Sequence, residues 1–197
     1  RAEVVGVVAV AHDDVFALLK NKLPAYLTYH SPAHTAHVIE MAEYICRQEN
    51  IDGRELYLVK IAALFHDVGF IRQTHHHEEI GCEMCAEKLT KHFFTAEEIR
   101  SVCGMIMATK IPQQPKTLLE KIVADADLEY LGTDQFYPIS KNLLQEFRHY
   151  DPHLTVERFN EIQVNFMRRH HFHTDFCIAN RAERKQQHLE ELLASTK

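Results

Sequence analysis

The scarcity of helix-breaking residues is the feature that most limits what this chain can fold into. Among 197 residues there are only six Gly and six Pro, and no stretch rich in Gly, Pro or Ser separates one part of the chain from another. Gly and Pro mark most turns and helix ends, so their scarcity favours helices joined by short connections. No segment shows the alternation of apolar and polar residues that a half-buried strand requires. The sequence therefore predicts an all-α, single-domain helical bundle of roughly seven to nine helices.

Apolar residues recur at helical spacing along much of the chain. One amphipathic helix is expected after Pro32 and another after the turn at Asp52 and Gly53. Their apolar rows are Val38, Met41, Ala42 and Ile45 in the first and Leu56, Val59, Ala63 and Leu64 in the second. Further helices are expected at 138–150, 155–170 and 175–193.

Two capping boxes and a proline loop divide the middle of the chain. Thr95 with Glu98, and Thr117 with Glu120, have the spacing at which a hydroxyl and a carboxylate satisfy the free N–H groups of a helix start. Between them, residues 111–115 contain two prolines, neither of which fits a helix interior, so this segment is expected to be a loop.

The charge of the chain argues against a nucleic-acid surface. The formal net charge is −6, whereas nucleic-acid binding needs clustered Lys and Arg to displace phosphate counterions. A small anionic substrate remains compatible with this charge, because a metal can supply local positive charge.

The beginning of the chain contains a short apolar run. The apolar run from Val4 to Ala11 is too short to span a bilayer, so no membrane segment is expected. It is compatible with the tail of a signal peptide, a first helix or strand, or a cut from a longer protein.

The five Cys are an odd number, and a CxxC-like pair, Cys82 and Cys85, lies in a helical stretch. We interpret all five as free thiols of a cytoplasmic protein.

A buried His–Asp pair is the strongest sign of chemistry. His66 follows Val59 and Ala62 at helical spacing, on the inward row, and Gly69 ends that helix. A His and an Asp buried at a helix end are costly unless a metal or a hydrogen-bond partner satisfies them. The pair His12 and Asp13 has no such surroundings and serves as an internal control.

Further N and O donors lie on neighbouring predicted helices. His30 and His34 are four residues apart, a spacing that places them close together on a helix, and His37 follows. Asp125 shares an inward row with Leu118 and Ile122. Asp127 lies about 200° around the helix from Asp125, so at most one of the two can be a direct ligand, and we expect Asp125.

In the order His34, His66-Asp67, Asp125, these residues resemble the H…HD…D signature of the HD-domain superfamily of metal-dependent phosphohydrolases. The segments that carry the resemblance are 29–38, Phe65-His-Asp-Val-Gly-Phe70 and Ala124-Asp-Ala-Asp-Leu128. The resemblance implies a single HD-type domain over 1–197, with a motif-bearing core at about 26–135 and C-terminal helices at 136–197. It implies metal ligation by His34, His66, Asp67 and Asp125.

The resemblance is incomplete at the position of a second metal. His77 precedes Gly81 by four residues, as does a second-metal ligand in two-metal members of the superfamily. A further His would be expected near 107–110, where this chain has Met-Ala-Thr-Lys. One metal is therefore favoured over two, with His77 contacting substrate or a weak second site. Lys110 is expected to offset phosphate charge in place of the second cation.

The implied activity is hydrolysis of a phosphomonoester or phosphodiester, with a nucleotide as the expected small substrate. Mixed N and O ligation suits Mn, Fe, Ni, Co or Zn better than Mg. Such an ion activates water, Asp67 would orient that water, and the resemblance to cyclic-nucleotide phosphodiesterases gives His30 the role of general acid.

Two alternatives stay open at this stage. The chain is either such an enzyme or a non-catalytic module that binds metal or nucleotide, within a larger signalling protein. The exposed faces of the terminal helices either cover the core or pair with a second subunit to form a homodimer.

Overall fold

The computed structural model describes residues 2–195 and is built of helices. Over this range there are ten α-helices, two short 3-10 helices (η) and no strand, which confirms the all-α prediction. In chain order they are α1 Ala2–Lys22, α2 Pro32–Gln48, α3 Gly53–Phe65, η1 Val68–Ile71, α4 His77–Thr90, α5 Ala96–Met107, α6 Leu118–Leu128, η2 Glu129–Gly132, α7 Phe136–Tyr150, α8 Val156–Arg169, α9 Asp175–Asn180 and α10 Ala182–Ser195.

The number of helices exceeds the seven to nine expected, and one predicted helix is divided. The stretch expected as a single helix over 175–193 breaks at Arg181, whose φ of −128° interrupts the helical path between α9 and α10. Arg181 donates to the buried carboxylate of Glu129 at 2.8 Å. That tertiary contact is absent from the local sequence pattern, which is why helical periodicity alone missed the break.

The predicted helix starts are present, with one difference. Thr95 and Glu98 form the reciprocal capping box. Thr117 caps α6 by accepting from the N–H of Glu120, but the Glu120 carboxylate accepts from Lys116 N and from the Thr117 hydroxyl rather than from Thr117 N. Both caps satisfy N–H groups that would otherwise lack a partner.

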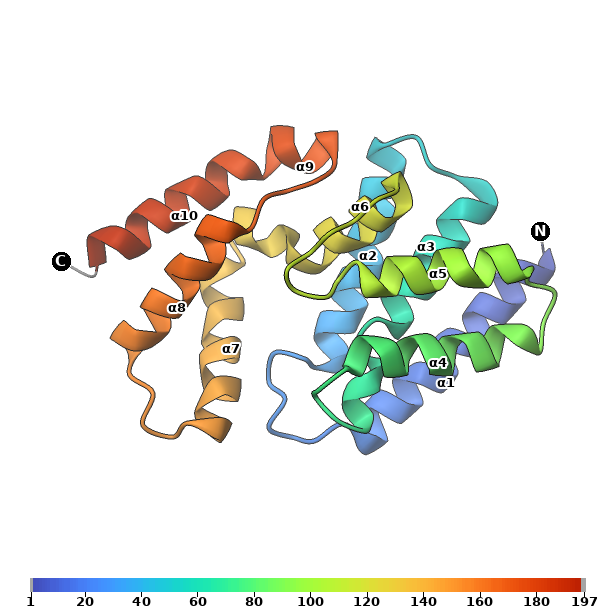
Figure 1. The fold of residues 1–197 in the computed structure, drawn as a ribbon, viewed down its shortest axis with the longest axis horizontal. Coiled ribbons are helices and arrows are strands. Elements are labelled where there is room, and N and C mark those ends of the chain that lie inside the picture. The colour runs from blue at the N-terminus through green and yellow to red at the C-terminus, as the bar shows by residue number, and fades with distance from the viewer. Residues whose placement is uncertain (1, 196–197) are drawn as a thin grey trace.

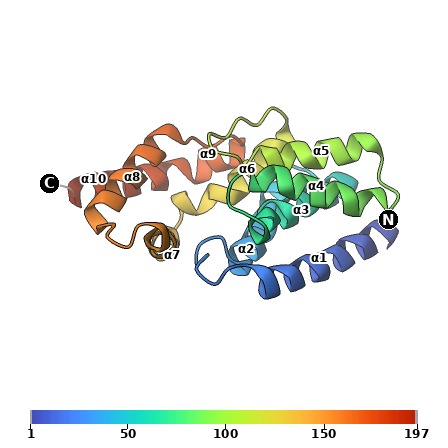
Figure 2. The same ribbon diagram turned by 60° about the horizontal axis from the view of Figure 1, so that its bottom comes forward.

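Helix α3 occupies the centre of the N-terminal half. Helix α1 covers one side of it and α4 and α5 cover the other, while α2 and α6 complete its surroundings (Figure 2). Seven of its thirteen residues are buried, which explains why its sequence is apolar on several faces. The opening run Val4–Ala11 is part of helix α1, and no helix among residues 2–195 is long and apolar enough to cross a bilayer.

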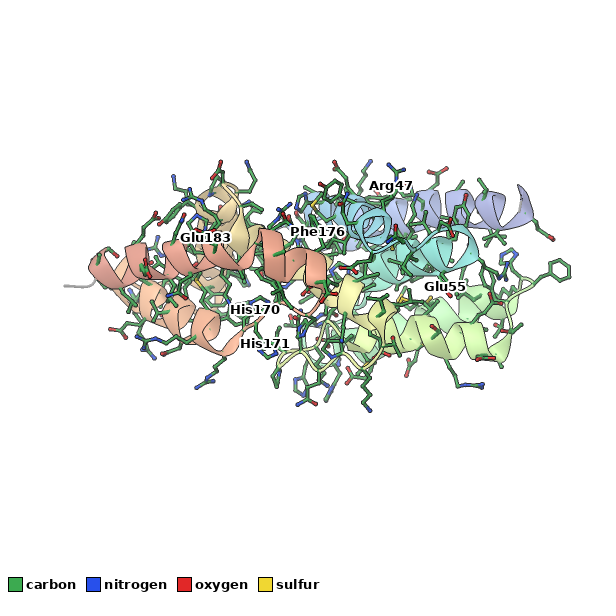
Figure 3. The ribbon with its side chains drawn as sticks, turned by 90° about the horizontal axis from the view of Figure 1, so that it is seen from above. Arg47, Glu55, His170, His171, Phe176 and Glu183 are labelled. Atoms are coloured by element: carbon green, nitrogen blue, oxygen red, sulfur yellow. The ribbon has the colours of Figure 1, made fainter. Side chains whose placement is uncertain are left out.

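The C-terminal helices form the other half of the molecule. Figure 1 shows α7, α8 and α10 grouped at one end and α1, α3, α4 and α5 at the other, with α6 between them and the termini at opposite ends. The junction is tied by α9, where Phe176 N donates to Glu49 Oε1 at the end of α2 (Figure 3). The candidate functional site lies where these two halves meet.

Two glycines allow α4 to approach the end of α3. A Cβ on Gly69 would lie 2.0 Å from the carbonyl oxygen of His77, and one on Gly81 would lie 2.7 Å from that of Phe65. No side chain fits at such distances, so glycine at these two positions brings His77 beside the His66-Asp67 pair.

Candidate metal centre and adjoining cavity

His66 lies immediately after the last turn of α3 and is fully buried. Its Nδ1–H donates to the carbonyl oxygen of Ala63 at 2.6 Å. This bond directs Nε2 away from the helix backbone and toward the carboxylates of Asp67 and Asp127, at 3.1 and 3.4 Å. A backbone carbonyl that holds one ring nitrogen while the other faces carboxylates is the usual support of a metal-binding His.

His34 reaches the same place from the first turn of α2. Ser31 caps this helix by accepting from His34 N. The His34 side chain is only 7% exposed, and its Nε2 lies 2.9 Å from Asp127 Oδ1 and 3.5 Å from Asp67 Oδ2. Three separate helix ends thus deliver two imidazoles and two carboxylates to one point.

The ligand atoms of His34, His66 and Asp127 lie within 4.8 Å of one another, and no other such group of His, Cys or carboxylate donors occurs among residues 2–195. The buried atoms His66 Nε2 and Asp67 Oδ2 have no hydrogen-bond partner. These two atoms nevertheless face each other at ion-pair distance, 3.1 Å. We therefore name His34, His66, Asp67 and Asp127 the HHDD cluster; its donors suit a divalent transition metal.

The charges within this cluster are strongly coupled. Burial by itself lowers the pKa of His66, but the carboxylates of Asp67 and Asp127 outweigh it and hold that pKa well above its ordinary value. Burial raises the pKa of each aspartate, yet the facing imidazoles lower both well below the ordinary range. Both carboxylates are therefore anionic at neutral pH, the state that a metal ligand requires.

The expectation that Asp125 joins the cluster is wrong in this structure. Asp125 is fully buried, as its row on the helix predicted, but its carboxylate accepts from the N–H groups of His173 and Thr174 and from the Thr174 hydroxyl, at 2.7 to 3.2 Å. Helix α6 is enclosed on both sides, and Asp127 faces α2 and α3 while Asp125 faces the segment before α9. Asp127 takes the position that was expected for Asp125.

His30 is held by a carboxylate that the sequence did not single out. Glu146 of α7, 4% exposed, accepts from His30 Nδ1 at 2.6 Å and from the backbone N–H groups of Tyr29 and His30. The ring of His30 stacks on that of Phe70, with centroids 4.3 Å apart, and lies 6.3 Å from that of His34. Glu146 is 116 residues from His30, and no local pattern distinguishes it from a surface glutamate of an amphipathic helix.

His77 lies beside the cluster, whereas Lys110 does not. His77 Nδ1 donates to Thr74 O at 3.1 Å, and Nε2 lies 3.4 Å from Asp67 Oδ1. Lys110 Nζ pairs with Glu79 Oε1 at 2.5 Å and is absent from the lining of the cavity next to the cluster. The structure thus does not bring Lys110 to the place where it was expected to offset phosphate charge. The control pair His12 and Asp13 lies exposed on α1.

A cavity of about 240 Å³ adjoins the HHDD cluster. Its lining includes Asp67 and Asp127 of the cluster together with His30 and His77. The remaining lining comes largely from apolar and aromatic side chains of η2, α7 and α8, which belong to the C-terminal half. A concave apolar pocket with a few polar groups at one end has the usual form of a small-molecule site.

Comparisons with known proteins agree with this geometry. A family model described as HD domain matches residues 33–129, a range that contains the whole cluster. The crystal structure of Bacillus subtilis YpgQ in complex with ADP is similar in fold, with a TM-score of 0.61 and 20% sequence identity over 96% of each chain. The search of curated proteins gave no match.

Proposed function

This chain belongs to the HD-domain superfamily, and we propose that it is a metal-dependent phosphohydrolase that cleaves a small phosphomonoester or phosphodiester. The observation that carries the proposal is the convergence of two buried imidazoles and two carboxylates at the edge of a cavity, where the ligand atoms of His34, His66 and Asp127 lie within 4.8 Å of one another. Such a set of N and O donors matches the ligands of a divalent transition metal.

His34, His66, Asp67 and Asp127 would hold one divalent ion. When bound, that ion would supply Lewis acidity toward water and a phosphate oxygen. Two nitrogen and two oxygen donors suit Mn, Fe, Co, Ni or Zn. One ion is favoured over two, because the segment 107–110 contains no His that could bind a second ion.

His30 would donate a proton to the leaving oxygen. Glu146 fixes the orientation of its ring through Nδ1, and the same carboxylate holds the two backbone N–H groups at 29 and 30. This leaves Nε2 as the nitrogen available to a substrate in the cavity that His30 lines. Glu146 is thus a positioning residue for a proposed catalytic His.

His77 would contact the reacting phosphate group. It lines the same cavity, and its Nδ1–H is already committed to Thr74 O, so Nε2 faces the cavity side near Asp67. Burial lowers the pKa of His77, but Asp67 and Glu78 together raise it above its ordinary value. A protonated His77 would offer an N–H donor to a phosphate oxygen.

A nucleotide is the first substrate class to test. The structural neighbour YpgQ was crystallised with ADP, and the cavity beside the cluster has an apolar part able to receive a ring.

The experiment measures metal content and hydrolysis on one preparation. Purified protein is assayed by elemental analysis and then with p-nitrophenyl phosphate, bis-p-nitrophenyl phosphate and a nucleotide panel, in Mn²⁺, Co²⁺, Ni²⁺ and Zn²⁺. We expect about one ion per chain and turnover that disappears in Asp67→Asn. Retained metal and bound nucleotide without turnover in any metal would instead favour the non-catalytic module.

A further inference from the structure

The C-terminal half contributes a wall of aromatic side chains to the cavity. Phe147 of α7 and Phe159 and Phe166 of α8 line it, and we name these three residues the aromatic wall. The rings of Phe147 and Phe159 pack edge to face at 5.8 Å, with an angle of 89° between their planes. All three lie outside the residues 33–129 that the HD domain match covers.

Aromatic rings arranged in this way favour binding of a ligand that contains a flat ring. Phe159 is almost fully buried, whereas Phe147 and Phe166 are partly exposed although they line an apolar cavity. Partly exposed aromatic faces inside a cavity can gain contact area when a flat ring stacks on them. Base-aromatic stacking is in addition tolerant of ring identity, since every such ring presents a π-face.

One amide accompanies the aromatic wall. Gln163 of α8 is 8% exposed and lines the cavity, and its side chain donates one long hydrogen bond of 3.4 Å to Asn160 Oδ1. A buried amide among apolar side chains is costly unless it is well paired. A ring with donors and acceptors on its edge would satisfy both the carbonyl and the NH₂ of Gln163.

The cavity lacks the Lys and Arg side chains that usually hold a chain of several phosphate groups. No Lys or Arg lines it, and the His, Asp and Glu residues that line it are His30, Asp67, His77, Glu78 and Asp127. Lys110, the side chain that was expected to offset phosphate charge, is instead paired with Glu79. A polyphosphate chain would bring several further negative charges into a cavity that, apart from the ion at the cluster, offers only His30 and His77 as possible cationic partners, which is unfavourable.

From these observations we infer that the aromatic wall and Gln163 form a ring-binding subsite, and that the ligand joins a flat ring system to a single phosphate group. If the proposed phosphohydrolase function is correct, this ligand is also the substrate. The assignment of the substrate class therefore rests on the proposed function. The reacting phosphate lies at the HHDD cluster, the ring lies against α7 and α8, and nucleoside triphosphates are discriminated against. Phe147, Phe166 and Gln163 are then the residues that determine specificity.

The first test is binding, which does not depend on turnover. Mn²⁺-loaded protein is titrated calorimetrically with inorganic phosphate, 1-naphthyl phosphate, a purine nucleoside monophosphate and the matching triphosphate. We expect both ring-bearing monophosphates to bind at least about tenfold more tightly than phosphate, and the triphosphate to bind about tenfold more weakly than the monophosphate. Equal affinities for phosphate and 1-naphthyl phosphate would overturn the subsite, and a tighter triphosphate would overturn the single-phosphate requirement.

Variants separate the two parts of the subsite. Phe147→Leu and Phe166→Leu keep apolar volume and should weaken both ring-bearing ligands about tenfold, while phosphate binding stays unchanged. Gln163→Leu should weaken only the nucleoside monophosphate and spare 1-naphthyl phosphate. Phe93→Leu, at a ring 83% exposed elsewhere on the surface, is the matched control and should change neither.

Turnover distinguishes this inference from the proposed function. If all phosphate esters are hydrolysed with the same kcat/KM, and Phe147→Leu changes none of them, hydrolysis stands and the subsite is wrong. If no ester is hydrolysed but the binding differences hold, the subsite stands and the proposed activity is wrong. Circular dichroism of each variant checks the fold, and Phe147→Tyr provides a second, ring-preserving variant that should retain wild-type binding.

Discussion

Asp125 and Asp127 lie two residues apart on α6 and face opposite neighbours. Asp127 Oδ1 lies 2.9 Å from His34 Nε2, whereas Asp125 Oδ2 accepts from Thr174 N at 2.8 Å. A separation of about 200° around the helix produces this division. One aspartate therefore belongs to the candidate metal centre, and the other fastens the segment that leads into α9.

Matched variants of these two aspartates should have different effects. Asp127→Asn replaces an anionic ligand by a neutral amide. The variant is therefore expected to lose the metal ion. Asp125→Asn should retain the ion but lower the free energy of unfolding by about 1–3 kcal/mol, since buried N–H donors lose their charged acceptor. Elemental analysis and urea denaturation measure the two effects. An Asp125→Asn protein that is stable but free of metal would contradict this assignment.

His30→Gln should impair hydrolysis according to the leaving group. An alkoxide needs a proton as it departs, so kcat for an alkyl phosphate should fall about 10²–10⁴-fold. p-Nitrophenolate departs without a proton, and its release should be affected far less. Glu146→Gln, which weakens the contact that orients the His30 ring, should show the same selectivity with a smaller loss. Equal losses on both substrates would show that His30 does not act as the acid.

Gly69→Ala tests whether the close approach of α4 matters. The added Cβ would lie 2.0 Å from the carbonyl oxygen of His77, and displacing this backbone should cost about 1–3 kcal/mol and move His77 away from Asp67. Gly6→Ala on α1 is the control. No atom lies within 4 Å of its added Cβ, so it should stabilise the protein by about 0.5–1 kcal/mol. Thermal unfolding with and without metal compares the two variants.

Burial patterns predicted part of the site and failed where a helix is covered on two sides. The inward rows that contain His66 and Asp125 were identified correctly, since both side chains are fully buried. Periodicity shows that a residue points into the protein but not which neighbour it meets, so it led to Asp125 as the expected ligand although Asp127 is the aspartate that faces His34. The same limit applies to Glu146, whose partner His30 is 116 residues away.

Lys110 shows a different limit of sequence reasoning. Its place just before the proline loop made it a candidate for phosphate contact, but the turn at the end of α5 directs it to Glu79 on α4. Glu79 lies in the first turn of its helix, where acidic residues are common for reasons unrelated to function. A pairing between two such surface groups leaves no mark in the sequence.

Metal removal should destabilise the fold as well as stop activity. An ion that binds only the folded state contributes about 2.7 kcal/mol when its concentration is a hundredfold above Kd. Chelation should therefore lower Tm in wild type, and added Mn²⁺ or Zn²⁺ should restore it. The same treatment should leave the Tm of Asp127→Asn unchanged. Differential scanning calorimetry of the two proteins, each with and without chelator, provides the comparison.

His170 should make the fold sensitive to acid. Burial lowers its pKa to about 3, with help from Lys185 and His173, and both of its buried ring nitrogens lack a hydrogen-bond partner. The unfolded chain takes up this proton near its ordinary pKa of about 6.5, so the stabilising contribution is complete above that pH and is lost progressively as pH falls toward 3. His170→Phe should therefore show a smaller drop in Tm than wild type between pH 7 and pH 4, measured by thermal unfolding. His92→Phe, at an exposed position, should keep the wild-type pH dependence, and an equal drop in His170→Phe would show that His170 is protonated as easily in the folded protein as in the unfolded chain.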